Sequence, residues 1–249
     1  MKIARFEHKG QAVWGSVRDD GINLLTGDIF AGPTETKEKV PLAGVKFLAP
    51  VLPSKIIGIG LNYKKHIEES PFKAPDVPMI FFKPSTSVIG HLDSIILPES
   101  NKVDYEGELG IVIGKKAKNV KESEALDYVL GCTVVNDVSA RDFHRQDNSF
   151  ARSKGVDTFC PFGPYIVTGL NPDNLKIETR LNGITVQSSN TNDLLFKVPQ
   201  LISFASKYFT LLPGDLIATG TPEGIGAIKK GDVIEVEVEK IGILKNFVS

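Results

Sequence analysis

Two apolar runs that carry carboxylates constrain this sequence most. The first, VDYEGELGIVIG, places Glu106 and Glu108 two residues apart, with aliphatic side chains directly after them. Side chains two apart on a β-strand share one face, so we expect both carboxylates at the mouth of a buried strand. The second run, CTVVNDVSARD, is also strand-like and delivers Asp137 at its end. A fold with this pattern must compensate carboxylates beside a hydrophobic core.

A bound cation is the simplest compensation. Three carboxylates brought together repel one another unless a positive charge lies between them. Hard oxygen ligands favour Mg2+, with Mn2+ as an alternative, over zinc. The sequence therefore predicts a divalent metal site formed by Glu106, Glu108 and Asp137, with Asp104 as a rival ligand on the same strand face. A solvated strand face is the competing interpretation of the E-x-E pair, and the aspartate at a second strand end favours the metal.

Composition narrows the class of protein. The chain has 249 residues, 41% of them hydrophobic, which suits one large domain with a small satellite. A formal net charge of -1 with interspersed signs gives no electrostatic footprint for nucleic acid or membrane, so a small-molecule ligand is expected. Neither a signal-peptide pattern nor a membrane-spanning apolar run is found. Cys132 and Cys160 lack zinc or redox spacing, which predicts packing roles and a reducing, cytoplasmic location.

Strand and turn signals predict a mainly β fold with few helices. Residues 1–50 form a small N-terminal β domain that ends in a polar, proline-bearing segment over residues 32–45. Residues 45–53 are expected to be a linker, and residues 54–249 form the main domain. Asn62 is expected to cap a helical turn that ends at Pro71, and residues 198–209 are the best amphipathic helix. The remaining expectations are a hairpin over residues 87–98, a long functional loop over 139–162 and a strand over 192–196.

His66 and Glu69 are three residues apart, so on a helical turn they share a face and the carboxylate can orient the imidazole. Such a pair can act as a general base and its partner. A solvated surface pair is the competing interpretation. The preceding Gly58 and Gly60 favour a site, because glycine allows a ligand to approach the backbone closely.

Several cations could bind an anionic substrate beside the metal. Lys83 ends a strand, while Arg141 and Lys154 lie in the expected loop, and each could hold a carboxylate. Arg152 is assigned to the solvent surface. Thr221 offers a hydroxyl in a Gly-Thr-Pro turn, which by itself is weak evidence for a site. The four histidines lack the spacing of an iron or copper oxygenase site.

Taken together, these motifs resemble the fumarylacetoacetate hydrolase superfamily, in its acylpyruvase, oxaloacetate decarboxylase and 2-hydroxyhepta-2,4-diene-1,7-dioate isomerase branch. The resemblance runs from about residue 55 to residue 247, through IGIGLNYKKHIEE, FFKPST, DYEGELGIVIGK, GCTVVNDVSARD, ARSKGVDTFCPFGP, LNGITVQSSNT and PGDLIATGTPEGIG. It implies a mixed β-sandwich or β-roll, a homodimer, and the small N-terminal domain of the bacterial and archaeal branch.

The resemblance also implies roles for individual residues. Glu106, Glu108 and Asp137 would carry Mg2+, with Asp104 as a neighbour. The catalytic residues would be His66, Glu69 and Lys154, and the substrate pocket would include Lys83, Arg141 and Thr221. One departure concerns the outer end of the substrate: many relatives have glutamine three residues after the arginine of SARD, and this chain has His144.

A metal-stabilised enolate of a 2-oxo or 2-enol acid explains this set of residues. Hydrolysis of a C–C bond in acylpyruvates, or decarboxylation of oxaloacetate, is expected first because the His66–Glu69 pair could activate water. Isomerisation of 2-hydroxyhepta-2,4-diene-1,7-dioate is the alternative. A non-catalytic oxo-acid-binding protein is disfavoured, because His66, Glu69 and Lys154 are all present.

Overall fold

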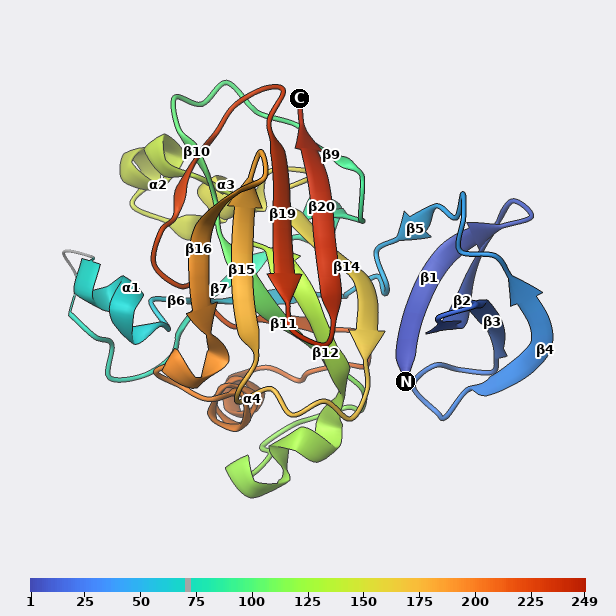
Figure 1. The fold of residues 1–249 in the computed structure, drawn as a ribbon. Helices are drawn as coiled ribbons and strands as arrows, with labels where there is room; N and C mark the ends of the chain where they lie inside the picture. Colours follow the sequence, from blue (N-terminus) through green and yellow to red (C-terminus); the bar gives the residue numbers. More distant parts are fainter. Residues whose placement is uncertain (70–72) are drawn as a thin grey trace.

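The mainly β fold predicted from the sequence is confirmed by a computed structural model, which describes residues 1–69 and 73–249 (Figure 1). A large sheet is formed by β1 (Lys2–His8), β2 (Gln11–Arg18), β3 (Gly21–Thr26), β4 (Thr34–Val40), β5 (Phe47–Leu48), β6 (Ile56–Gly60), β7 (Met79–Lys83), β8 (Val88–Ile89), β11 (Gly107–Ile113), β12 (Val129–Asn136), β14 (Cys160–Val167) and β17 (Leu216–Ala218). Its main path runs β4-β3-β2-β1-β14-β12-β11-β17-β6-β7.

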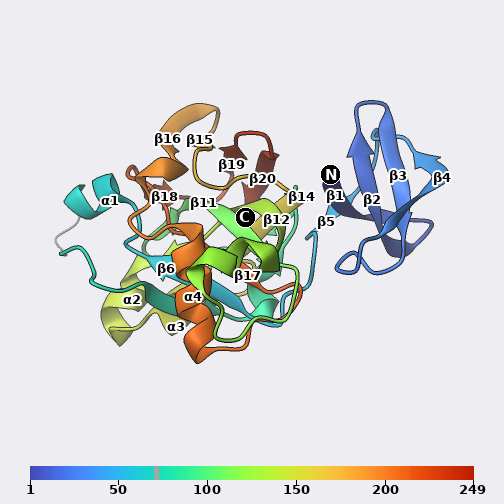
Figure 2. The same ribbon diagram turned by 90° about the horizontal axis from the view of Figure 1, so that it is seen from below.

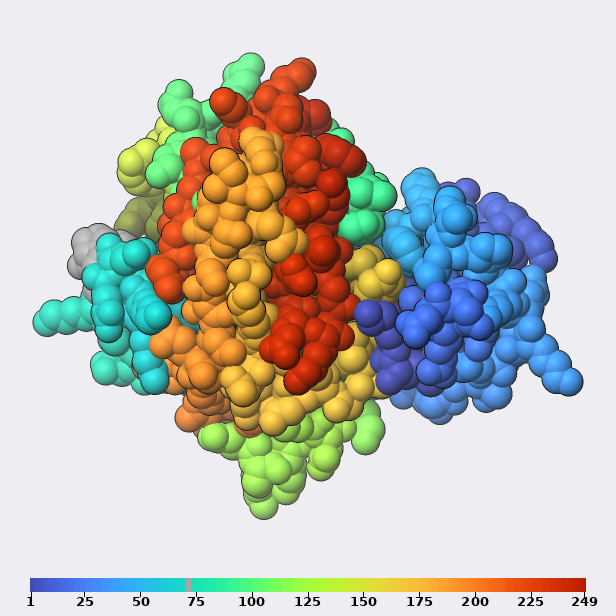
Figure 3. All heavy atoms as spheres, in the orientation of Figure 1, coloured from blue at the N-terminus to red at the C-terminus, as the bar shows by residue number. Residues whose placement is uncertain are grey.

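A second sheet covers one face of the central strands. It consists of β9 (Ser94–Ile95), β15 (Lys176–Leu181), β16 (Ile184–Asn190), β19 (Val233–Val238) and β20 (Gly242–Val248), in the order β16-β15-β19-β20-β9. Strands β15, β19 and β20 contact β11 and β12, and Figure 3 shows this sheet across the front of the molecule. Every residue of β11 is buried, because neighbouring strands and layers enclose it on all sides.

Helices and short strands complete the main body. A small sheet pairs β13 (Ser139–Ala140), β10 (Val103–Tyr105) and β18 (Gly226–Ile228). The helices are α1 (Lys64–Glu69), α2 (Arg141–Asp147), α3 (Phe150–Gly155) and α4 (Val198–Tyr208), with 3-10 turns at Ser85–Ser87, Glu122–Tyr128 and Thr191–Asp193.

The helix predicted over residues 198–209 is present as α4 (Figure 2). The Gln200 side chain accepts a hydrogen bond from the Lys197 backbone amide, which satisfies a free donor at its N-terminus. Leu201, Ile202 and Ala205 face the core, where they join aliphatic side chains of both sheets. Among residues 1–69 and 73–249, every helix falls short of the length and apolarity that a membrane span requires.

The N-terminal unit continues the large sheet. Strand β1 pairs antiparallel with β14, with Ile3 opposite Ile166. Residues 1–50 contain a small core cluster of their own around Phe6 and Ile22, while Ile3 belongs to a cluster that also contains residues of β12 and β14. In Figure 1 the unit lies at one side of the main body, opposite α1.

Some local expectations were wrong. The expected linker over residues 45–53 contains strand β5, which pairs with β1. The expected hairpin over 87–98 does not form, because β8 pairs with β14 and β9 pairs with β20, both in parallel. Residues 139–162 contain β13, α2 and α3, and the expected strand at 192–196 begins with a 3-10 turn.

The segment around Asn62 also differs from expectation. The Asn62 side chain bonds Phe196 and the Thr219 carbonyl, so it anchors the β6–α1 connection without capping a helix. The predicted helix stop at Pro71 lies outside the described residues.

Candidate metal centre and active site

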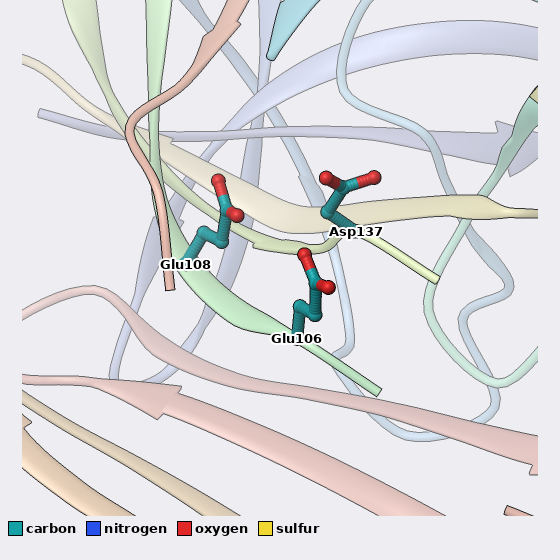
Figure 4. A group of neighbouring side chains, drawn as sticks. All are labelled: Glu106, Glu108 and Asp137. Carbon is teal, nitrogen blue, oxygen red and sulfur yellow. The ribbon is translucent and has the colours of Figure 1, made fainter. Parts of the chain in front are cut away.

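The ends of three strands bring the carboxylates together. Glu106 lies between β10 and β11, Glu108 lies on β11, and Asp137 follows β12 directly. Gly107 is opposite Asn136 in the register of β11 and β12, which sets the two strand ends side by side. One oxygen of each carboxylate lies within 4.8 Å of the others. Figure 4 shows the three side chains directed toward a common space.

Buried cations surround this group. Lys154, on α3 and only 4% exposed, donates from Nζ to Glu106 Oε2 at 2.8 Å and to Asp137 Oδ2 at 2.5 Å. Lys83 ends β7, is 1% exposed, and donates to Asp137 Oδ1 and to the Val138 carbonyl. Arg141 begins α2 and donates from Nε to Asp104 at 2.8 Å and from Nη2 to Glu106. Three positive charges therefore hold Glu106 and Asp137 in place.

The surroundings shift the pKa values of Glu106 and Glu108 in opposite directions. Burial raises the pKa of Glu108 well above its usual range, and the charges of Asp137 and Glu106 raise it further. Burial also acts to raise the pKa of Glu106, but Lys154 and Arg141 outweigh it and lower that pKa to about 2. Burial acts to lower the pKa of Lys154, yet Asp137 and Glu106 raise it overall, so this lysine is charged. Glu108 is the carboxylate with the least cationic compensation.

The Gly-Thr-Pro turn supports Glu108 and its strand. The Gly220 amide donates to Glu108 Oε2 at 2.8 Å, while the Thr221 hydroxyl donates to the Gly107 carbonyl and accepts from Gln187. Gly220 has φ of 101°, and a Cβ there would lie 2.8 Å from the Cβ of Asn62, so glycine is required. Thr221 thus bonds the start of β11, and Lys83 forms an ion pair with Asp137.

His66 and Glu69, which the sequence predicts to act as a pair, lie in different surroundings. His66 is partly buried on α1, whereas Glu69 is exposed, and no hydrogen bond joins the two within residues 1–69 and 73–249. Burial lowers the pKa of His66, Glu106 opposes this, and Arg141 lowers it further. The imidazole therefore lies within electrostatic reach of the carboxylate group and favours its neutral, basic form.

Sequence reasoning missed Glu223, which follows the Gly-Thr-Pro turn. Its Oε2 and Nδ1 of His66 are both buried without a hydrogen-bond partner in the described part of the chain, and its charge raises the pKa of His66. Ser139 was also missed: its hydroxyl bonds Lys154 at 2.9 Å and Glu106 at 3.3 Å. Ser139 lies two residues after Asp137, and this spacing could have indicated that Ser139 belongs to the site. The sequence around Glu223 and Gln187 contains no comparable signal.

Two placements correct the sequence interpretation. Lys154 was expected in an open polar loop, but it is on a helix and buried, because the carboxylates compensate its charge. Asp104 was a rival ligand by spacing. The chain changes partners at Glu106, with β10 pairing to β13 and β11 to β12, so Asp104 faces Arg141 and lies outside the group of three. Arg152 is exposed and paired with Asp147, as its surface assignment requires.

The donor set fits a hard divalent cation. Three buried carboxylates offer oxygen ligands within 4.8 Å of one another, and Glu108 has a raised pKa that a nearby cation would reverse. None of the three is a nitrogen or sulfur ligand, which disfavours zinc. Besides these three possible ligands, Lys154 and Arg141 bond members of the group and His66 lies within electrostatic reach of Glu106.

Comparisons with known proteins agree along the whole chain. Residues 55–249 match the family model described as fumarylacetoacetate (FAA) hydrolase C-terminal, and residues 1–50 match Rv2993c-like, N-terminal. An uncharacterised protein of Archaeoglobus fulgidus is 53% identical over 98% of this chain and 94% of its own length. The mitochondrial oxaloacetate tautomerase Fahd2a of Rattus norvegicus is 47% identical over 83% of this chain and 70% of its own. A crystal structure of 5-carboxymethyl-2-hydroxymuconate delta-isomerase from Mycobacterium smegmatis has a TM-score of 0.94 and 43% identity, covering 100% and 99% of the two chains.

Proposed function

Because the chain belongs to the fumarylacetoacetate hydrolase superfamily, we propose that it is a Mg2+-dependent enzyme, with Mn2+ as an alternative, acting on 2-oxo or 2-enol acids. The observation that carries this proposal is the buried group of Glu106, Glu108 and Asp137, with Lys154 bonded to two of its members and His66 within electrostatic reach. Such a group is costly in a stable fold and is typical of a functional site.

Each residue around the group has a role in this proposal. A divalent cation, when bound, would supply a Lewis acid that stabilises negative charge on the substrate oxygens. Lys154 and Arg141 hold the substrate carboxylate and the adjacent oxygen by charge-assisted hydrogen bonds. His66 accepts or returns a proton at the carbon beside the 2-oxo group, because its lowered pKa keeps the imidazole unprotonated near neutral pH. Glu69 acts on His66 through charge, while Lys83 and Thr221 fix Asp137 and the β11 strand.

Proton transfer between the enol and keto forms is the reaction best supported. Hydrolysis was favoured from the sequence because a His66–Glu69 pair could activate water, and that hydrogen bond is not present within the described residues. The rat relative is named an oxaloacetate tautomerase and the mycobacterial one an isomerase, which favours proton transfer at carbon. Hydrolysis of acylpyruvates and decarboxylation of oxaloacetate are the second candidate, because a basic His66 can take a proton from water as well as from carbon.

A substrate panel tests this assignment. Enol oxaloacetate, an acylpyruvate and 2-hydroxyhepta-2,4-diene-1,7-dioate would be assayed with Mg2+, with Mn2+ and with a chelator. We expect metal-dependent ketonisation of oxaloacetate faster than either C–C cleavage or loss of carbon dioxide. Turnover that is unaffected by the chelator would contradict the metal assignment. Metal binding without turnover of any of these acids would favour a non-catalytic binding protein.

His66→Ala separates the two candidate reactions. If His66 is the carbon base, the variant should lose exchange of the C3 protons of pyruvate with deuterium oxide as completely as metal-stripped enzyme does. If His66 activates water, exchange should persist while cleavage of an acylpyruvate stops. Proton NMR reports the exchange directly, and wild-type cleavage by the variant would exclude both roles.

The cellular location, the domain organisation and the oligomeric state are also part of the proposal. A reducing, cytoplasmic location is supported by Cys132 and Cys160, which are free and buried, with the pKa of each thiol raised to about 12 by burial. Two domains, residues 1–50 and 54–249, and a homodimer are expected as in the family. Light scattering after size exclusion tests the dimer, and a monomer at micromolar concentration would contradict it.

A further inference from the structure

A second histidine lies at the edge of the same site. His144 is on α2, three residues after Arg141, so the two side chains share one helix face. Arg141 reaches inward to Glu106, and the His144 side chain lies one helical turn from Arg141, within electrostatic reach of Glu106. Both α1, which carries His66, and α2 lie on the side of the molecule remote from the N-terminal unit (Figures 1 and 2).

An aromatic wall, formed by His144, Phe150 and Phe81, connects this position to the site. The His144 ring stacks on Phe150 with centroids 4.4 Å apart and planes 24° apart, and Phe150 lies 5.2 Å from Phe81. Lys154 Nζ lies 4.7 Å from the Phe81 centroid and 6.0 Å from that of Phe150. The wall therefore runs from the lysine bonded to Glu106 and Asp137 out to a partly exposed imidazole.

The His144 imidazole is free to bind a ligand. Its stacking on Phe150 fixes the ring plane, while no hydrogen bond to residues 1–69 or 73–249 occupies its nitrogens. The charged groups that act on it are Arg141 of α2, Lys154 of α3 and Glu106 beside β11. Arg152 of α3 and Asp147 of α2 pair with each other. An anion at this end of the wall would meet a rigid donor.

We propose that His144 is a specificity residue that binds the distal carboxylate of a 2-oxo dicarboxylic acid, and that this selection strengthens as pH falls. This rests on the proposed function, since the 2-oxo end must lie at the carboxylate group for the tail to follow the aromatic wall. The apolar middle of the wall accommodates the carbon chain, and the imidazolium donates a charge-assisted hydrogen bond to the distal oxygen.

The sign of the pH dependence follows from the surroundings. Burial lowers the pKa of His144 in the free protein, Arg141 and Lys154 lower it further, and Glu106 opposes them. A bound distal carboxylate stabilises the imidazolium and raises that pKa. By linkage, affinity for the dicarboxylate then increases as pH falls from above the liganded pKa to below the free pKa. An acid with an uncharged tail gains nothing from this protonation.

Two matched acids test the proposal in the Mg2+-loaded protein. 2-Oxoglutarate and 2-oxopentanoate have the same chain length and differ in the distal carboxylate. Their affinities would be measured by NMR from about pH 8 downward through the free pKa of His144, and we expect the preference for 2-oxoglutarate to increase toward a limit of about tenfold if binding raises that pKa by about one unit. The chain contains only four histidines, so the His144 resonance can be assigned by its loss in His144→Gln.

Two variants on α2 test whether His144 itself causes the pH-dependent preference. His144→Gln keeps a neutral donor of similar reach, so it should leave a preference that no longer varies with pH, while Arg145→Gln, which removes an exposed cation of the same helix, should behave as wild type. A pH-dependent preference that persists in His144→Gln, or a His144 pKa unchanged by 2-oxoglutarate, would overturn the proposal. If both acids shift the His66 resonance without affecting His144, only the present inference fails. If neither acid perturbs either histidine, the proposed function itself is wrong.

Discussion

At the scale of single residues, the site consists of charges that water does not compensate. Glu108 and Asp137 are each 1% exposed, so their charges depend on Lys83, Lys154, backbone amides and any bound cation. A surface ion pair contributes little to stability, whereas removal of one partner of a buried pair leaves an uncompensated charge. Substitutions here should therefore affect stability and ligand binding together, and controls have to separate the two.

The carboxylate group should bind Mg2+ only when all three members are present. Asp137→Asn and Glu108→Gln keep the side-chain volume and remove one ligand charge, and we expect each to weaken Mg2+ binding by more than about 100-fold. Calorimetric titration measures this. The control is Asp104→Asn, a buried carboxylate outside the group of three, which should retain near wild-type affinity. Undiminished binding in either of the first two variants would contradict the ligand assignment.

Lys154 should separate metal binding from turnover. Lys154→Met removes the ammonium that bonds Glu106 and Asp137, so in chelator the free energy of unfolding should fall by about 3–5 kcal/mol. Mg2+ can take over that compensation, and its affinity should be equal to or higher than that of wild type because no lysine competes for the oxygens. Turnover should be lost even at saturating metal. Denaturant unfolding with and without Mg2+ checks the first two points, and retained turnover would exclude a catalytic role.

His66 should set the acid limb of the pH–rate profile. Its pKa is lowered chiefly by burial, so the neutral imidazole persists below the ordinary histidine value of about 6.5. A base that must be unprotonated loses activity as pH falls through its pKa. The acid limb of kcat/KM should therefore lie below about pH 6.5 in wild type. An acid limb at higher pH would show that another group, or a charged His66, controls the reaction.

At the scale of elements, the aliphatic runs were sufficient to predict most strands. The runs that became β6, β7, β11, β12, β15, β19 and β20 are bounded by turn residues, and burial of their side chains requires little more than that pattern. Helices α2 and α3 lack an apolar period, because their inward residues include Arg141 and Lys154, whose burial depends on distant carboxylates. Likewise, β8 and β9 are each two residues long and are defined by partners far along the chain. Local patterns contain no information on such pairings.

The same limit applies within the site. The carboxylate group could be predicted because strand period and strand ends determine where Glu106, Glu108 and Asp137 lie. The contacts of Glu223, Gln187 and Ser139 depend on how segments far apart in the chain meet, as does the burial of Lys83. The His66–Glu69 spacing was correct for a shared helix face, but exposure of Glu69 depends on how α1 packs.

The contact between β6 and β7 gives an element-scale prediction. Gly58 is opposite Phe81 in the register, and a Cβ at Gly58 would lie 2.1 Å from the Phe81 ring. Gly58→Ala should therefore displace the ring beneath Lys154 and cost about 1–3 kcal/mol of unfolding free energy. The control Gly60→Ala on the same strand meets the flexible tip of Met79 at 3.2 Å and should cost less. Equal stabilities of the two variants in urea unfolding would contradict this account.

At the scale of the whole molecule, the N-terminal unit and the main body share both a sheet and a core. The β1–β14 pairing continues the hydrogen-bond ladder across the division at residues 50–54. One core cluster contains Ile3, Ile29 and Val51 together with Phe162 and Ile166 of β14. The separate cluster around Phe6 and Ile22 is small, so residues 1–50 bury little apolar surface without their neighbour. The N-terminal unit and the main body match two different family models, but because they share a sheet and a core they can unfold as one unit.

Calorimetry of the intact chain tests this coupling. We expect a single cooperative transition, and a lower melting temperature for residues 54–249 alone, because truncation exposes the edge of β14 and the apolar side chains that Ile3 and Val51 cover. Ile3→Ala should lower the free energy of unfolding by about 2–4 kcal/mol, and the variant should still unfold in a single transition. Glu38→Gln, on the exposed strand β4, is the control and should leave the transition unchanged. Two resolved transitions in the intact chain, with Ile3→Ala affecting only the smaller one, would show that residues 1–50 fold independently of the site they adjoin.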